Sequence, residues 1–262
     1  MVLTDTHTHL YYEKEPEARN QLMQRCFSNE IERLFLPNVS SRSIDLVFDL
    51  TDAFPENCFP MLGLHPCDVK PEAENDLNDF RHELDFIHNY LGQRKIYAIG
   101  EIGLDLYWDK TTLEIQKEAF KVQIDWAKSL DLPIVIHCRD AFDEIYEILL
   151  EEKDAKLRGI FHCFSGNLDQ ANKIIALGFY LGIGGVVTYK NSGLDKVVAE
   201  LSLENLVLET DSPYLTPVPF RGKQNESSYL IYIAQKVADL HHTSIEEVAR
   251  ITTGNSRKVF GI

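Results

Sequence analysis

The sequence predicts a (β/α)8 barrel, an α/β fold in which eight parallel strands are each followed by a helix. A chain of 262 residues is the usual length of one such barrel. Short apolar runs alternate with longer amphipathic segments along the whole chain. No stretch rich in proline, glycine and serine separates two halves. We therefore expect a single domain that spans residues 1–262.

The expected strands are short runs that are almost entirely apolar, as strands buried on both faces should be. They cover residues 2–7, 33–37, 59–64, 95–100, 133–137, 159–162, 179–183 and 206–209. An open doubly wound sheet is the alternative fold, and it usually carries a glycine-rich turn after its first strand. Here the first strand ends in histidines, which favours the barrel.

Amphipathic stretches between these runs are the expected helices. They cover residues 16–27, 41–54, 77–91, 113–130, 141–151, 168–177 and 194–201, and a further helical region begins at about residue 228. Ser41, Asp76 and Thr112 stand at helix starts, where a side-chain oxygen can accept hydrogen bonds from free backbone N–H groups.

The composition is that of a globular, acidic protein. Hydrophobic residues make up 44% and charged residues 26%, which excludes a disordered chain or a disulfide-dense miniature scaffold. The net charge of −15 disfavours non-specific coating of nucleic acid, because that binding depends on many Lys and Arg contacts with phosphates. Phosphate chemistry at one site stays open, since carboxylates can gather divalent cations there.

The sequence also bears on the cellular compartment. The N-terminus carries charged and imidazole side chains before any apolar stretch, and no run of about 18 apolar residues occurs. The five cysteines are an odd number without a CxxC pair, which fits reduced thiols better than a disulfide framework. We expect a cytoplasmic protein without a signal peptide or membrane span.

Two histidines close the first expected strand. His7 and His9 are two residues apart, so they lie on the same face of the strand and point in the same direction. Catalytic residues of (β/α)8 enzymes lie at the carboxyl ends of the strands. The pair is therefore a candidate metal site, and further ligands should close other strands.

Further metal-binding residue types occur at four other strand ends. Glu101 follows the fourth expected strand, His137 ends the fifth, His162 ends the sixth and Asp211 follows the eighth. The carboxyl ends of barrel strands meet at one rim, so these side chains should converge with the histidine pair. Each alone is more often a structural residue, but six on one rim favour a metal centre.

Six nitrogen and oxygen ligands are too many for one tetrahedral ion and suit two divalent cations about 3.5–4 Å apart. We expect Glu101 to bridge the ions. One ion would take His7, His9 and Asp211, and the other His137 and His162. A hydroxide bridging the two ions would then attack an ester bond. Asp211 would orient the attacking water and accept its proton.

Six motifs occur in a fixed order along the chain: DTHTH at residues 5–9, GLHP at 63–66, AIGEIGLD at 98–105, PIVIHCR at 133–139, HCFSG at 162–166 and ETDSPYL at 209–215. In these motifs the chain resembles the TatD family of metal-dependent nucleases, which are amidohydrolase-like barrels. The resemblance implies a cytoplasmic hydrolase of phosphodiester bonds in DNA that acts from the 3′ end. It also implies Mg²⁺, or another divalent ion such as Mn²⁺ or Zn²⁺. The family's late RGKxNEP segment reads RGKQNES here, with Ser227 at the proline position.

Four residues are candidates for contact with a substrate. Arg139 lies two residues beyond His137 and offers a planar fork of donors to phosphate oxygens, although a structural ion pair is equally compatible. His65 ends the third strand and could touch substrate or metal. Arg221 and Asn225, in the loop after strand eight, could hold phosphate, base or sugar.

Three other functions remain open. The same metal site could hydrolyse a carboxylic ester or amide, such as a small-molecule lactone or a mischarged aminoacyl-tRNA. A phosphoesterase of the polymerase-and-histidinol-phosphatase type also begins with paired histidines, but its barrel has seven strands. A silent metal-binding scaffold fits six ligands around a cleft less well. The leading prediction is a nuclease acting on single-stranded or frayed DNA ends, without an obligate protein partner.

Overall fold

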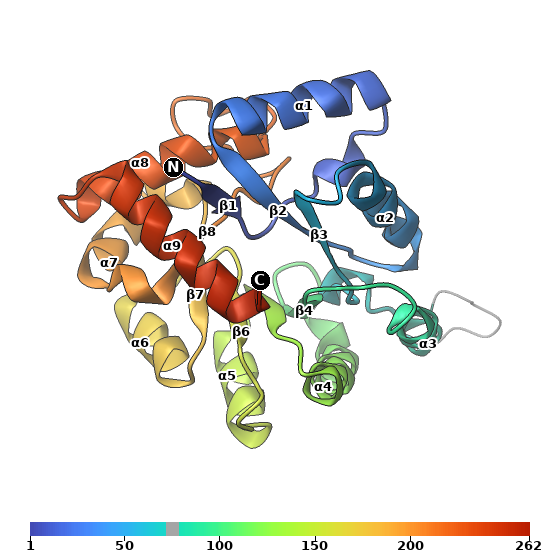
Figure 1. Cartoon of the computed structure of the whole chain (residues 1–262). Coiled ribbons are helices and arrows are strands. Elements are labelled where there is room, and N and C mark those ends of the chain that lie inside the picture. Colours follow the sequence, from blue (N-terminus) through green and yellow to red (C-terminus); the bar gives the residue numbers. More distant parts are fainter. Residues whose placement is uncertain (72–78) are drawn as a thin grey trace.

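A computed structural model describes residues 1–71 and 79–262. In these residues eight parallel strands follow one another around a barrel, with helices outside (Figure 1). The strands are β1 (Leu3–Asp5), β2 (Ile31–Pro37), β3 (Cys58–Met61), β4 (Ile99–Asp105), β5 (Ile134–Arg139), β6 (Gly159–Phe161), β7 (Tyr180–Ile183) and β8 (Leu206–Leu208). The predicted (β/α)8 fold is confirmed.

Backbone hydrogen bonds close the barrel at two seams. Strands β1–β3 and β4–β8 form two continuous ladders. The Leu62 N–H donates to the Ala98 carbonyl at 3.3 Å and joins β3 to β4. The Thr6 N–H donates to the Leu208 carbonyl at 3.0 Å and joins β8 back to β1. The carboxyl ends of all eight strands therefore share one rim.

Helices cover the outside of the strands. They are α1 (Pro16–Ser28), α2 (Ile44–Ala53), α3 (Phe80–Tyr90), α4 (Leu113–Leu130), α5 (Phe142–Glu151), α6 (Leu168–Ala176), α7 (Leu194–Glu200), α8 (Leu230–Leu240) and α9 (Ile245–Phe260). Asn167 and Gln170 form a capping box at the start of α6. Asp79 caps α3 by accepting from two backbone N–H groups. The expected cap Asp76 and the expected helix start at 77–78 lie outside the described residues.

Helix α9 closes the end of the barrel opposite the strand carboxyl ends. Its last turn places Val259 and Phe260 in a buried apolar cluster with Phe35, Val135 and residues of four other strand regions. The Phe260 ring stacks on Phe35 with centroids 3.7 Å apart. Figure 1 shows α9 crossing the barrel beside the C-terminus. Among the described residues this end of the barrel is therefore filled by apolar side chains. Within the described part of the chain, no helix is both long and apolar enough to span a membrane.

Strand β4 differs most from the prediction. It runs over Ile99–Asp105, not over residues 95–100. Ile102 and Leu104 are fully buried and pair with Ile136 and Cys138 of β5, so the ladder continues beyond Gly100. Glu101 consequently lies within β4, and the strand ends at Asp105.

Candidate metal centre

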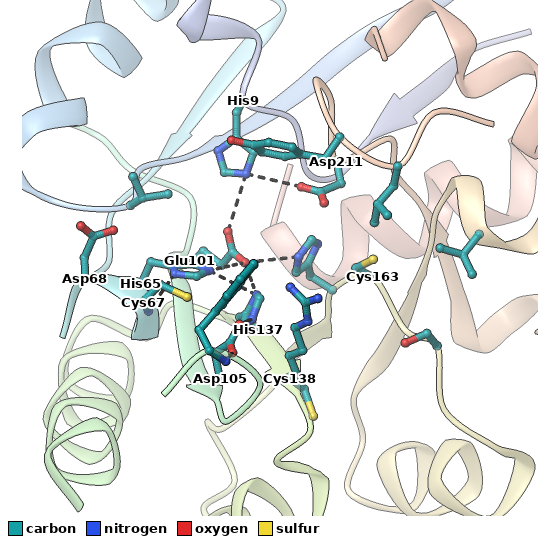
Figure 2. A pocket seen from close by; sticks show the side chains of 18 of the residues that line it. His9, His65, Cys67, Asp68, Glu101, Asp105, His137, Cys138, Cys163 and Asp211 are labelled. Atoms are coloured by element: carbon teal, nitrogen blue, oxygen red, sulfur yellow. Dashed lines mark hydrogen bonds and ion pairs between the residues drawn. The ribbon is translucent and has the colours of Figure 1, made fainter. Parts of the chain in front are cut away.

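The six predicted ligands converge at the mouth of the barrel. His7 and His9 follow β1, Glu101 lies in β4 and His137 in β5. His162 directly follows β6, and Asp211 lies in the loop after β8. Five of them line a cavity of about 670 Å³, and His7 is fully buried behind it. Figure 2 shows imidazoles and carboxylates from distant parts of the chain turned toward Glu101. This volume lies within the range of roughly 300–1,000 Å³ that is usual for ligand pockets.

One group of donor atoms surrounds Oε2 of Glu101. The His7 and His9 Nε2 atoms are 3.3 Å apart, and His7 Nε2 is 3.2 Å from Glu101 Oε2. Asp211 Oδ1 lies 3.5 Å from His9 Nε2. Two imidazole nitrogens and two carboxylate oxygens thus point at one small volume. A divalent cation satisfies all of these lone pairs at once, so the donor set fits a metal ion.

A second group surrounds Oε1 of the same carboxylate. His137 Nδ1 lies 2.8 Å from Glu101 Oε1, His162 Nε2 at 3.2 Å and His65 Nε2 at 3.3 Å. Glu101 is therefore the shared member of both groups and offers one oxygen to each. A carboxylate in this position can bridge two cations.

The grouping of His162 differs from the predicted pairing with His137. His162, His7 and Glu101 have donor atoms within 4.8 Å of one another, and the His162 ring stacks on His7 with centroids 3.6 Å apart. The His137 and His162 rings are 6.1 Å apart. His162 accordingly lies between the two groups, and His65 is the imidazole nearest to His137.

Two carboxylates hold the ligand imidazoles from behind. Asp105 Oδ2 lies 2.9 Å from His137 Nε2, and Glu209 Oε1 lies 3.0 Å from His162 Nδ1. Sequence reasoning missed Asp105, although it lies four residues after Glu101 and so shares its face of the strand. Such partners fix the tautomer and orientation of a metal-binding histidine.

Asp5 contacts backbone N–H groups and a hydroxyl rather than a ligand imidazole. Its carboxylate accepts hydrogen bonds from the Thr210 N–H at 2.9 Å, the Thr210 hydroxyl at 2.6 Å and the His7 N–H at 3.3 Å. It thereby ties the loop after β1 to the loop after β8, the two segments that carry His7 and Asp211.

The imidazoles set the charge state of the central carboxylates. Burial raises the pKa of Glu101, but His65, His162 and His7 outweigh it and hold that pKa well below its usual value. Burial likewise opposes ionisation of Asp211, yet its contact with His9 and the nearby histidines lowers its pKa. Both carboxylates are therefore ionised near neutral pH and suited to bind cations.

The ring of His65 has a defined proton position. Its Nδ1 accepts a hydrogen bond from the Cys67 N–H at 3.1 Å. Burial lowers the pKa of His65, so the neutral form is favoured. A neutral imidazole with an acceptor at Nδ1 carries its proton at Nε2. That N–H points toward Glu101 and His137, where it can donate to a ligand oxygen.

The predicted substrate contacts fall in three different environments. Arg139 lines the cavity and stacks its guanidinium on Tyr107 at 3.8 Å. Arg221 stacks on Tyr189 at 3.8 Å and is exposed. Asn225 is 3% exposed and donates to the Thr210 carbonyl at 2.8 Å. The position of Asn225 corrects the expectation of a substrate contact, because its amide is used inside the protein.

Ser227 makes a bond that the family's proline could not. It begins the 3₁₀ turn Ser227–Tyr229 and is fully buried. Its hydroxyl donates to Thr8 Oγ1 at 2.9 Å. Thr8 separates His7 from His9, so the late loop is fastened to the metal-binding segment.

The chain is similar to known proteins along almost its whole length. The family model described as TatD related DNase matches residues 4–261. The uncharacterized metal-dependent hydrolase YabD of Bacillus subtilis is 38% identical over 262 residues, which is all of both chains. The crystal structure of YjjV, a TatD homologue from Escherichia coli, superposes with a TM-score of 0.90 at 27% identity, covering 99% of this chain and 98% of that one. A TatD family hydrolase from Entamoeba histolytica has the same fold, with a TM-score of 0.83 at 21% identity, covering 99% of this chain and 98% of that one. The chain therefore belongs to the TatD family of metal-dependent hydrolases.

Proposed function

We propose that this hydrolase cleaves phosphodiester bonds of DNA and releases nucleotides from the 3′ end of single-stranded or frayed strands. The observation that carries the proposal is the position of Glu101. Its two oxygens face two sets of imidazoles, at 2.8–3.3 Å from Oε1 and 3.2–3.7 Å from Oε2. The family description adds DNA as the substrate.

The two donor groups around Glu101 would hold two divalent ions. His7, His9 and Asp211 would serve one and His137 the other, each sharing Glu101, with His162 between the two positions. When bound, such ions lower the pKa of a water molecule and polarise the bond to be cleaved. Mg²⁺ is the proposed ion. The imidazole-rich donor set also suits Mn²⁺ and Zn²⁺.

The chain's own residues would position the substrate and move its protons. Asp211 lies at the cavity with an ionised carboxylate, where it can orient the attacking water and accept its proton. The His65 Nε2–H would donate to a non-bridging phosphate oxygen or to Glu101. Arg139 supplies planar donors at the cavity wall.

A titration of metal-depleted protein tests this function. Mg²⁺, Mn²⁺ and Zn²⁺ are added separately while mononucleotide release is followed from oligonucleotides labelled at the 3′ or 5′ end. We expect metal-dependent release of the 3′ label first and its loss in His137→Ala. His88→Ala, a matched change on the exposed side of α3, should retain activity. Undiminished release by His137→Ala would contradict the proposal.

Hydrolysis of a carboxylic ester or lactone is the second candidate. Among the described residues that line the cavity, Arg139 is the one Lys or Arg. A neutral ester needs no cationic side chains around it, so this lining favours an ester substrate. A panel of oligonucleotides, lactones, aryl esters and aminoacyl-tRNA at matched metal concentration separates the two candidates, and activity confined to esters would overturn the nuclease proposal.

A further inference from the structure

We propose that exposed aromatic side chains around the mouth of the barrel form a stacking site for the bases of a single-stranded nucleic-acid end. This inference rests on the proposed function and specifies how the substrate is held. The key residues are Trp108 on one side of the mouth and Tyr12 and Tyr214 on the other. They are substrate-binding residues, distinct from the metal ligands.

Exposed aromatic residues are concentrated at this mouth. In the described residues six aromatic side chains are largely exposed, namely Tyr12, Phe86, Tyr107, Trp108, Tyr214 and Tyr232. Three of these line the cavity that contains the candidate metal ligands, and Tyr107 is next to Trp108. Trp108 is 71% exposed and Tyr214 53% exposed. Large apolar groups gathered in solvent around a cavity are typical of a binding surface.

Trp108 belongs to a stack that is already partly assembled. Arg139 lies over the Tyr107 ring at 3.8 Å and over Trp108 at 5.5 Å. The Tyr107 and Trp108 rings meet edge to face, with centroids 4.9 Å apart. Arginine planes and aromatic rings are the usual partners of unpaired bases. This wall therefore offers one extended surface for a base.

Tyr12 and Tyr214 lie on the opposite side, beside a metal-binding histidine. Tyr12 follows β1 and Tyr214 follows β8, whereas Trp108 follows β4, halfway around the eight-stranded barrel. The Tyr12 ring is parallel to His9 within 13°, with centroids 5.7 Å apart, and Tyr214 meets the same histidine edge-on at 6.1 Å. Bases held at the two walls would place the intervening phosphate over Glu101.

Both walls are fastened to the metal centre. Asp105 Oδ1 accepts the Tyr107 N–H at 3.0 Å and the Trp108 N–H at 3.3 Å, while Oδ2 contacts His137. The Tyr214 N–H donates to the Asp211 carbonyl at 2.8 Å. The distance from each aromatic wall to the reacting bond is therefore set by residues of the centre itself.

The charge distribution favours binding through uncharged surfaces. The chain has a net charge of −15, and Arg139, the one Lys or Arg in the described cavity lining, is itself stacked on a ring. With so few cationic groups, phosphate contacts alone would give weak affinity. Stacking uses the uncharged faces of bases and tolerates any sequence. We thus expect a shallow dependence of affinity on salt.

Steady-state kinetics on two substrates test the stacking site. One is a single-stranded oligonucleotide, and the other is the same strand lacking its two 3′-terminal bases. We expect Trp108→Ala and Tyr214→Ala to raise KM for the intact strand by roughly 5- to 150-fold with kcat changed less than about threefold. On the abasic strand the same variants should have the KM of the native protein, because that strand has no terminal base to stack on the side chain.

Three further variants separate the effect of stacking from the effects of side-chain size and of removing any exposed aromatic residue. Trp108→Phe should restore most of the affinity, whereas Trp108→Leu should not. Phe86→Ala removes an exposed aromatic side chain on α3 and should change nothing. An equal effect of Trp108→Ala on intact and abasic strands, or no effect on either, would overturn the proposal.

Binding measurements do not depend on catalysis, so they test the stacking site separately from the proposed nuclease function. The dissociation constant of a labelled single strand is measured by fluorescence anisotropy for native protein and Trp108→Ala at several salt concentrations. Tight native binding that Trp108→Ala weakens supports stacking even if no nucleotide is ever released, an outcome that would refute the nuclease proposal alone. Binding that is unaffected by Trp108→Ala and falls steeply with salt would refute stacking alone.

Discussion

Asp105 Oδ2 lies 2.9 Å from Nε2 of His137, whose other ring nitrogen lies 2.8 Å from Glu101 Oε1. A neutral imidazole carries one proton. If Nδ1 is to offer a lone pair to a cation beside Glu101, that proton must be on Nε2, where Asp105 accepts it. Asp105 therefore selects the tautomer of His137 that can bind metal.

Asp105→Asn should weaken metal binding although the side chain keeps its shape. With the amide oxygen retained by the Tyr107 and Trp108 N–H groups, the amide nitrogen would face His137 Nε2 and favour the opposite tautomer. We expect the metal affinity to fall about 10- to 100-fold, as measured by calorimetric titration of metal-depleted protein. Asp109→Asn, at the exposed cap of the next turn, is the control and should bind like the native protein. Equal affinity in both variants would show that Asp105 has no such role.

Gly182→Ala should destabilise the protein and disturb His162. A Cβ at this position would lie 2.2 Å from Glu209 Oε2, the carboxylate that holds His162 from behind. Overpacking of this kind costs roughly 1–3 kcal/mol, which urea denaturation can measure. Gly184→Ala is a matched control two residues away, since the new Cβ would lie 3.8 Å from Glu209 Cγ, an ordinary van der Waals contact. An equal loss of stability in the two variants would show that close approach to Glu209 Oε2 is not what destabilises Gly182→Ala.

Much of the fold could be predicted because each element carries its own local pattern. The helix α4 was expected over the residues it occupies, 113–130, and the buried apolar strands alternate with helices as the sequence indicates. The end of β4 could not be placed, because Gly100 and Gly103 interrupt its apolar run. What extends this strand is pairing with β5, which depends on residues more than thirty positions away.

The site was predictable to the extent that strand ends must meet at one rim. This rule brought together histidines and carboxylates from five strands, including Glu101 and Asp211. It could not reveal which groups share a cation, because that depends on ring orientation; His65 proved to be the near neighbour of His137. Nor could it show that the side chain of Asn225 turns inward, because loop direction is decided by tertiary contacts.

Asn225→Ala should act on stability more than on substrate binding. The amide nitrogen donates to the carbonyls of Thr210 and Tyr214, and the amide oxygen accepts from the Glu226 N–H. Leaving buried backbone groups unpaired costs about 1–3 kcal/mol per group. We expect a lower denaturation midpoint in urea. A variant of native stability with a raised KM would instead restore the earlier interpretation of Asn225 as a substrate contact.

Removal of divalent ions should lower the thermal stability as well as abolish activity. Ions bind the folded protein preferentially, because the unfolded chain separates Glu101 from the histidines that complete each group. At a free metal concentration 100 times Kd the stabilisation is about 2.7 kcal/mol. For a chain of this size the corresponding rise in Tm is about 5–10 °C, which differential scanning calorimetry with and without a chelator measures.

Glu101→Gln is the decisive comparison. It keeps the side-chain volume but removes the charge shared by both groups, so the metal-dependent rise in Tm should largely disappear. A full rise in this variant would place the bound ions elsewhere in the molecule.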